Sequence, residues 1–358
     1  MSGGIDSSVA AAILKRVGVD ELRSSSRFAN ARVFDVVGVF MKLYDSPRFK
    51  EAEKRAREIA EILKIPFLSL DLRKEFKKRI INYFLNEYKK GITPNPCIVC
   101  NKEIKFGLLL EKALALDADY VATGHYVRTS LLKNLTIVKN VSRVRLFRGK
   151  DKERDQSYFL WMLNQNQLRR ILFPIGDYAR AEVKSLAKKF RMFFLTKIPK
   201  SMEICFIQTT INDFLKRYLK PKLGAIVTVD GKKIGEHQGL FFYTIGQRKG
   251  IELPGGPFYV LDKDLKKNFL IVTKNERDLY KKELIARNVN WIFGKEPKLP
   301  LKVKAKIRYR HEPASAAIYK IPNTKYKILF NKPQRAITPG QSVVFYRKQE
   351  LLGGGIIC

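Results

Sequence analysis

Compact apolar runs alternate with segments of helical period over the first half of the chain. The run at 33–41 (VFDVVGVFM) is rich in β-branched residues and predicts a buried strand, whereas 50–63 repeats alanine and aliphatic residues at helical spacing. Strands that alternate with helices predict an α/β fold with a doubly wound parallel sheet. The same reasoning predicts further strands at 66–70 and 119–123, and further helices at 9–14, 75–89, 104–116, 155–172 and 181–190.

The pattern changes after residue 205. A short helix is expected at 211–219, followed by strands at 224–229 and 239–245 with a hairpin turn at Asp230–Gly231 between them. Residues 257–358 form short strand-like runs separated by Pro, Gly and Asn, which is typical of a small β-barrel. Three domains are therefore predicted: an α/β domain at 1–208, a small central domain at 209–273 and a C-terminal β-barrel at 274–358.

Composition narrows the class of protein. The 358 residues carry a formal net charge of +36, which favours a polyanionic partner; the alternative is a lysine-rich bias that decorates every solvated face. Four cysteines are too few for a disulfide scaffold in a chain of this size. The chain has no apolar stretch of membrane-spanning length and no signal-peptide pattern. We therefore expect a cytoplasmic protein, away from membranes, with reduced thiols; its oligomeric state is left open.

The segment MSGGIDSSVAAAIL at the start of the chain has the features of a phosphate cradle. Gly3 and Gly4 allow a tight turn and a close approach of backbone N–H groups to a ligand, and serine hydroxyls add donors. The alanine-rich run that follows predicts a helix with its positive end toward this turn. No Gly-Lys-Ser/Thr follows, so this is not the P-loop pattern. The alternative is an ordinary Gly-Ser turn before a helix.

A second dense motif lies at 93–106, with the sequence TPNPCIVCNKEIKF. Two prolines stiffen the loop, and Cys97 and Cys100 sit just before a predicted helix, whose dipole is expected to lower thiol pKa. Lys102 and Lys105 would add to that effect. Cys205 supplies a further thiol. The alternative for each cysteine is a buried, small hydrophobic residue.

These motifs resemble those of a known family. SGGxDS is similar to the pyrophosphatase loop of the PP-loop ATPases, which split ATP into AMP and pyrophosphate. The second motif resembles the NPxxxCNxxIKF signature of the bacterial and mitochondrial tRNA-specific 2-thiouridylases, which use ATP and a persulfide to replace the 2-oxygen of the wobble uridine with sulfur. Further matching blocks run the length of the chain: ATGHY (122–126), DQSYFL (155–160), ICFI (204–207), FYTIGQRKG (242–250), IRYR (307–310) and PQRAITPGQ (333–341).

The resemblance implies the chemistry and its residues. The α/β domain would be catalytic: ATP, with Mg²⁺, would adenylate the uridine, Cys205 would carry the incoming sulfur as a persulfide, and Cys100 would release it and close a transient disulfide with Cys205. Partners would be the tRNAs for Lys, Glu and Gln and a persulfide-donor protein. The nucleotide would be bound by Ser2, Gly3, Gly4, Asp6, Ser7, Met41 and Gly124. The flipped base would face Asn95, Pro96 and Cys97, and the tRNA would contact His125, Arg154, Asp155, Gln156, Arg308, Tyr309 and Gln341.

The sequence departs from the family pattern at several points. Cys97 stands where many members have Asp, so Cys97, Cys100 and Cys205 could alternatively hold a 4Fe-4S cluster or zinc. The approach to Cys205, residues 200–203, also differs. Residues 19–34 resemble an insertion of unassigned role, and His237 is expected to be a turn histidine. A strand should feed the phosphate loop and none precedes Met1, so we expect a start site assigned too late or a truncated form.

Two other functions remain open at this point. An amidating or ligating PP-loop enzyme would share the loop and the adenylation but would not need Cys100 and Cys205. A non-enzymatic RNA-binding protein with an inactive ATPase fold would use the basic surface alone. Neither alternative accounts for the paired cysteine motifs.

Overall fold

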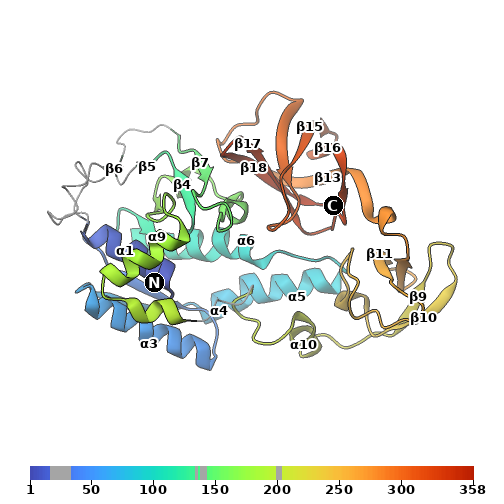
Figure 1. The fold of residues 1–358 in the computed structure, drawn as a ribbon, viewed down its shortest axis with the longest axis horizontal. Helices are drawn as coiled ribbons and strands as arrows, with labels where there is room; N and C mark the ends of the chain where they lie inside the picture. The colour runs from blue at the N-terminus through green and yellow to red at the C-terminus, as the bar shows by residue number, and fades with distance from the viewer. Residues whose placement is uncertain (17–33, 134–135, 138–142, 199–203) are drawn as a thin grey trace.

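The computed structural model describes residues 1–16, 34–133, 136–137, 143–198 and 204–358 (Figure 1). The expected insertion at 19–34, apart from its last residue, and the segment 200–203 lie outside the described residues. An α/β unit holds the N-terminus, a barrel holds the C-terminus, and a small sheet lies beside the barrel. In the part of the chain that the structure describes, no helix is both long enough and apolar enough to cross a membrane.

Parallel strand pairs confirm the α/β class of the first unit. Strand β1 (Gly38–Lys42) pairs in parallel with β2 (Phe67–Asp71), and β3 (Val121–Ala122) pairs in parallel with β8 (Ile171–Leu172). Within the described residues these are two separate pairs rather than one continuous sheet, and β1 begins later than the predicted 33–41. The helices of this unit that flank the strands are α1 (Ile5–Arg16), α3 (Pro47–Ile62) and α9 (Arg180–Lys189).

Two long helical segments extend from this unit toward the other two (Figure 1). Both contain a stretch of π-helix, a feature that often marks functional sites. The predicted helices at 75–89 and 104–116 are confirmed, although the second begins earlier, at Pro96, where the ring suits the first helical position. Their consecutive parts are α4 (Arg73–Phe76), η1 (Lys77–Ile81) and α5 (Asn82–Lys89), then α6 (Pro96–Cys100), η2 (Asn101–Leu108) and α7 (Leu109–Leu114).

Two predicted elements are wrong. The helix expected at 155–172 is instead a 3-10 turn, η3 (Ser157–Leu160), then a short helix, α8 (Gln165–Leu168), and then β8. Its apolar residues are buried on all sides, so their spacing does not reflect one helix face. The strand expected at 239–245 is a 3-10 turn, η5 (Leu240–Phe242), because Gly239 adopts a φ of 152° and breaks the extended chain.

The C-terminal half contains the small sheet and the barrel. The small sheet has the strand order β10-β9-β12-β11, and the barrel closes where β13 pairs with β18. The predicted strand-rich character of 257–358 is thereby confirmed. The bounds are α10 (Ile211–Lys216), β9 (Gly224–Val227), β10 (Lys233–His237), β11 (Tyr259–Asp264), β12 (Phe269–Thr273), η6 (Glu276–Leu279), β13 (Tyr280–Trp291), β14 (Leu301–Lys306), β15 (Ala314–Ile321), β16 (Lys325–Arg335), β17 (Ser342–Arg347) and β18 (Glu350–Ile357).

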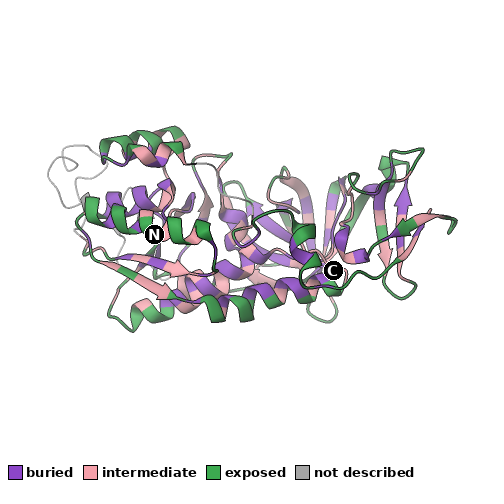
Figure 2. Cartoon of the chain, turned by 90° about the horizontal axis from the view of Figure 1, so that it is seen from below, coloured by how far each residue is buried: buried purple, intermediate pink, exposed green. Residues whose placement is uncertain are grey.

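The units share sheet edges and core. Strand β18 continues the barrel sheet into β7 (Leu146–Arg148) and β4 (Val127–Thr129) of the first unit. Phe84 of α5 packs edge-on against Phe206 and Phe214, with ring centroids 5.4 and 5.9 Å apart, so one apolar core joins the long helices to the central domain. Figure 2 shows buried residues inside each unit and along the helices between them. The remaining elements are β5 (Leu132–Lys133), β6 (Thr136–Ile137) and η4 (Phe193–Lys197).

Candidate functional site

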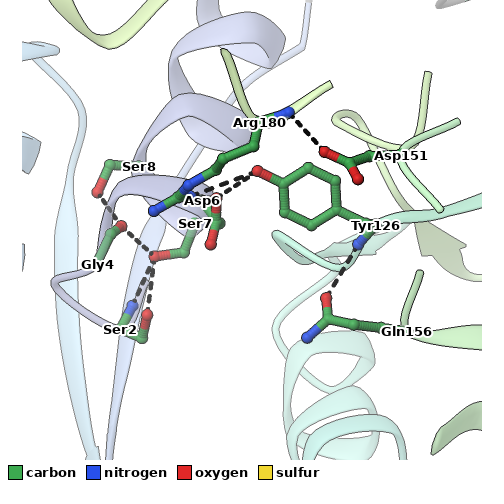
Figure 3. A network of polar contacts seen from close by, with 9 residues as sticks. All are labelled: Ser2, Gly4, Asp6, Ser7, Ser8, Tyr126, Asp151, Gln156 and Arg180. Atoms are coloured by element: carbon green, nitrogen blue, oxygen red, sulfur yellow. Dashed lines mark hydrogen bonds and ion pairs between the residues drawn. The ribbon is translucent and has the colours of Figure 1, made fainter. Parts of the chain in front are cut away.

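The glycine-serine loop wraps around the start of α1 (Figure 3). Gly3 has a φ of 66°, and a side chain there would lie 2.3 Å from the Ala52 carbonyl oxygen, so only glycine fits. The Ser7 hydroxyl accepts from the Ser2 N–H at 3.0 Å and donates to the Gly4 carbonyl at 3.1 Å. The first N–H groups of a helix have no carbonyl partner within the helix. The loop therefore presents backbone donors and exposed hydroxyls at a positive helix end, as an anion site requires.

Gly124 lies directly against this loop. A side chain on Gly124 would come within 2.5 Å of the Asp6 carbonyl carbon and the Ser7 nitrogen, so the turn after β3 packs on the first turn of α1. Met41, near the end of β1, is half-buried and packs beside Leu70. The structure thus brings the loop and Gly124 together at the carboxyl ends of the parallel strands, where ligands bind in such folds.

Asp6 has two partners that sequence reasoning missed. Tyr126 donates its hydroxyl to the Asp6 carboxylate at 2.8 Å, and Arg180, the first residue of α9, forms an ion pair with the same carboxylate. The Gln156 side chain accepts from the Tyr126 N–H at 3.0 Å and fixes this turn. Tyr126 lies within a matched block, but Arg180 is 174 positions from Asp6, and no local spacing connects them.

Cys97 and Cys100 lie on α6, the helix that begins at Pro96. Cys97 is half-buried and Cys100 is buried in the apolar core of the long helices. Burial raises the pKa of the Cys100 thiol to about 12; the positive charge of Lys105 opposes this effect but is weaker. The expectation that the helix and the lysines lower this pKa is wrong, because Cys100 lies at the far end of a five-residue helix, where desolvation dominates.

Cys205 lies close enough to Cys100 to interact with it electrostatically. The residue is exposed, yet desolvation by the surrounding protein raises the pKa of its thiol, against the positive charges of Lys105 and Arg48. The exposed surface of Cys205 gives reagents access to the residue, whereas the protein atoms around it are the cause of the raised pKa. Among the described residues, no three His, Cys, Asp or Glu side chains form a group that could hold a metal ion. In this conformation the three cysteines therefore do not form a preassembled 4Fe-4S or zinc site, although both Cys97 and Cys205 lie near Cys100.

Comparisons with known proteins cover the whole chain. The family model described as "tRNA methyl transferase HUP domain" matches residues 1–209, the "tRNA methyl transferase PRC-barrel domain" matches 212–274 and the "Aminomethyltransferase beta-barrel domain" matches 281–357. The tRNA-specific 2-thiouridylase MnmA 2 of Thermoanaerobacter sp. (strain X514) is 44% identical over 374 residues, covering 100% of this chain and 96% of its own. The tRNA-specific 2-thiouridylases MnmA of Carboxydothermus hydrogenoformans and Clostridioides difficile are each 41% identical, also over 100% of this chain and 96% of theirs.

The chain belongs to the tRNA-specific 2-thiouridylase family. The descriptions of the family models mention methyl transfer, whereas the relatives reported above are named 2-thiouridylases. The family predicted from the two motifs is thereby confirmed. The predicted architecture, an α/β domain followed by a C-terminal β-barrel, is confirmed as well.

In this 2-thiouridylase-family chain, the loop that leads into Cys97 is attached to the other two domains. Gln341 of the barrel donates its side-chain amide to the carbonyl oxygens of Thr93, at 2.9 Å, and Pro94, at 3.3 Å. The Thr93 N–H donates to the Pro339 carbonyl, and the Thr93 hydroxyl lies 3.3 Å from that of Thr244 in the central domain. The predicted base-facing residues that follow are half-buried Asn95, buried Pro96 and half-buried Cys97.

The predicted tRNA residues of the barrel lie at the junction with the α/β unit. Tyr309 is half-buried with its ring 4.5 Å from that of Phe159, and the Lys306 ammonium lies 5.5 Å from the Tyr309 ring. Arg154 is near enough to Tyr309 to lower its pKa electrostatically, against the larger effect of burial. Arg308 donates to the Ala336 carbonyl at 2.7 Å and so links two segments of the barrel. The Tyr309 ring, with Lys306 and Arg154 near it, is a suitable surface for a nucleotide.

Three other predicted tRNA residues make internal contacts. Asp155 is 3% exposed and forms an ion pair with Arg148 at 2.7 Å. His125 is buried between Phe106 and Phe173, and this burial holds its pKa well below the usual value. Gln156, as described, holds Tyr126. Their contacts with tRNA stay predictions; in this conformation Asp155 and His125 offer little surface to a ligand.

His237 is a satisfied turn histidine, as expected. Its Nδ1 accepts from the Gly239 N–H at 3.0 Å, which leaves Nε2 to donate to the Asn268 carbonyl at 3.1 Å. Both ring nitrogens are therefore used within the central domain, and burial lowers the pKa of the ring.

Proposed function

We propose that the chain is an ATP-dependent sulfurtransferase that converts the wobble uridine of tRNA to 2-thiouridine. The observation that carries the proposal is that one α/β unit holds both a glycine-serine loop packed against Gly124 and two neighbouring cysteines, Cys100 and Cys205. Full-length relatives named tRNA-specific 2-thiouridylase support it. An amidating enzyme would need the loop but not the cysteines, and the methyl transfer in the family-model descriptions would need neither.

The loop would serve the first half of the reaction. The 2-oxygen of uridine attacks the α-phosphate of ATP, the bond from the α-phosphate to the bridging oxygen breaks, and pyrophosphate leaves. Ser2, Ser7 and the backbone N–H groups at the start of α1 would hold that pyrophosphate. Mg²⁺, when bound, would neutralise part of its charge, and the part-exposed carboxylate of Asp6 is the loop group suited to hold it. Met41 and Gly124 would flank the adenosine.

The cysteines would serve the second half. Cys205 would carry a persulfide; the Cys100 thiolate attacks the Cys205 sulfur, the disulfide forms, and the terminal sulfur leaves as hydrosulfide. Hydrosulfide then displaces AMP from the adenylated C2 of uridine. The two cysteines are thereby oxidised as the transferred sulfur is reduced, and cellular thiols reset them. Because the pKa of Cys100 is raised to about 12, its thiol is neutral at rest. Cys100 must therefore lose its proton before it attacks the Cys205 sulfur.

The tRNA would bind across the junction of the α/β unit and the barrel. The net charge of +36 suits a polyanion, and the expected tRNA-facing groups include Arg154, Arg308 and Tyr309. We propose that the substrates are the tRNAs for Lys, Glu and Gln and that a persulfide-donor protein loads Cys205. Asn95, Pro96 and Cys97 would face the base, which must leave the anticodon stack to be reached.

The test is nucleoside mass spectrometry of tRNA incubated with the protein, ATP, Mg²⁺ and a persulfide source. The variants are Cys205→Ser and, as a matched control, Cys358→Ser, which removes an exposed cysteine outside the motifs. We expect 2-thiouridine from the wild type and from Cys358→Ser but none from Cys205→Ser. Equal product from Cys205→Ser with sulfide alone would overturn the persulfide role, and absence of product from all three would overturn the proposed function.

A further inference from the structure

Arg180 reaches from the first turn of α9 into the glycine-serine loop (Figure 3). Its guanidinium Nη1 forms the ion pair with Asp6 and lies 3.4 Å from the Tyr126 hydroxyl. Its backbone N–H donates to the Asp151 carboxylate at 2.9 Å, which fixes the start of the helix. The side chain is 25% exposed, so it lies at the edge of the loop rather than in the core.

One donor of this guanidinium is unused. The Nε of Arg180 is buried from solvent and has no hydrogen-bond partner among the described residues. Leaving a buried donor unpaired is unfavourable, and more so when the group is charged. A ligand oxygen that entered beside the loop would supply the missing acceptor.

The charges at the loop also favour a phosphate ligand beside Arg180. A carboxylate at Asp6 repels the phosphates of a nucleotide, and the guanidinium of Arg180 offsets that charge at the same place. Arg55, which also approaches the loop, is directed differently: its Nε donates to the Gly3 carbonyl and its Nη1 pairs with Glu51. Arg180 is therefore the cation paired with the loop's own carboxylate.

We propose that Arg180 binds the β- and γ-phosphates of the nucleotide, and the pyrophosphate formed from them. The proposal rests on the proposed function for the identity of that ligand. The guanidinium exchanges the Asp6 carboxylate for phosphate oxygens, a planar donor set that suits them. Asp6 keeps the Tyr126 hydroxyl as its partner when Arg180 moves, because Gln156 holds the Tyr126 backbone in place. Arg180 thus pairs with Asp6 when the loop is empty and with the triphosphate when a nucleotide is bound.

Calorimetric titration of ATP, pyrophosphate and AMP, each with Mg²⁺, tests the proposal on the full chain. The variants are Arg180→Gln and Arg180→Lys. The control is Lys150→Gln, which removes an exposed ion pair between Lys150 and Glu182, a residue of α9. We expect Arg180→Gln to weaken ATP and pyrophosphate by about 10- to 100-fold and to leave AMP within about threefold, since only the first two ligands carry the phosphates that Arg180 holds. Arg180→Lys should be intermediate, and the control should match the wild type.

The outcomes separate three cases. Unchanged pyrophosphate affinity in Arg180→Gln, or an equal loss for AMP and ATP, would show that Arg180 only neutralises Asp6 or supports the fold, and would overturn the proposal. A wild type that binds neither ATP nor pyrophosphate would instead refute the proposed function. Thermal unfolding of each unliganded variant is recorded beside the titrations. If Arg180→Gln unfolds early, Arg180→Lys decides, because it keeps the charge but loses the planar donor set.

Discussion

The side-chain amide of Gln341, in the barrel, donates to the backbone carbonyl of Thr93, four residues before Cys97. Gly340 lies so close that a side chain on it would come within 2.1 Å of Ile92, and the Thr93 N–H returns a hydrogen bond to Pro339. The turn at 338–341 is thus fitted to the loop that carries the predicted base-facing residues. Gln341, which the resemblance assigns to tRNA binding, therefore also positions the loop that leads into Cys97 and Cys100.

Replacing Gln341 with alanine should therefore lower turnover more than it lowers tRNA affinity. Loss of two hydrogen bonds of about 1 kcal/mol each loosens the loop, which keeps only the bonds of Thr93 to Pro339 and Thr244, so we expect kcat to fall about five- to tenfold with tRNA Kd nearly unchanged. Single-turnover thiolation and tRNA binding are measured in parallel. Gln349→Ala, an exposed turn residue of the barrel, is the matched control. A rise in Kd with unchanged kcat would show instead that Gln341 acts as a direct tRNA contact.

The raised pKa of Cys100 predicts a strong pH dependence of its alkylation. Only the thiolate reacts, and a pKa of about 12 leaves a very small thiolate fraction at pH 7.5. Iodoacetamide followed by peptide mass spectrometry should label exposed Cys358 first, and Cys100 slowest. The Cys100 rate should rise about tenfold per pH unit as long as the pH stays below its pKa. Labelling of Cys100 as fast as Cys358 at pH 7.5 would contradict the buried, neutral thiol.

Asp155 should matter for stability whatever its role toward tRNA. Asp155→Ala leaves the mostly buried guanidinium of Arg148 without its carboxylate partner, so we expect a loss of about 3 kcal/mol in the free energy of unfolding, measured with urea. The control is Asp177→Ala, which removes an exposed pair with Arg128 at 3.8 Å and should cost less than about 1 kcal/mol. Equal effects of the two variants would mean that the Asp155 pair contributes no more than a surface pair.

Local chemistry in the sequence predicted the turn at Gly3 and Gly4, the long helices and the barrel. Gly3 could be assigned because a tight turn before a helix favours glycine, whereas the helix after the cysteine motif was expected from residue 104 and in fact begins at Pro96. The Cys100 pKa could not be predicted in the same way. The dipole and the lysines are visible in the sequence, whereas the desolvation that outweighs them comes from burial in an apolar cluster whose members extend along the chain from Leu43 to Val272.

Long-range contacts explain the other gaps. Arg180 and Asp6 meet only after α1 and α9 pack together, and Gln341 reaches Thr93 across 248 positions. The resemblance predicts a tRNA contact for Gln341, but it could not show that the amide of this side chain binds a backbone carbonyl. The buried segment around Trp161 was predicted as a helix because burial on all sides has no periodic signature.

Tyr309 gives the sharpest test of the junction as a nucleotide-binding surface. Its half-buried ring packs against Phe159, with the Lys306 ammonium nearby, so a stacked nucleotide would gain from both ring and charge. Stacking on one ring contributes about 1–3 kcal/mol, and Tyr309→Ala should therefore weaken tRNA binding about 5- to 100-fold. Tyr309→Phe should keep most of the affinity, because the ring remains. Tyr319→Ala, an exposed barrel tyrosine at 39% exposure, is the matched control, compared by filter binding at fixed salt. If Tyr309→Ala and Tyr319→Ala bind tRNA equally well, the tRNA does not stack on Tyr309, and the tRNA path must be sought elsewhere on the basic surface.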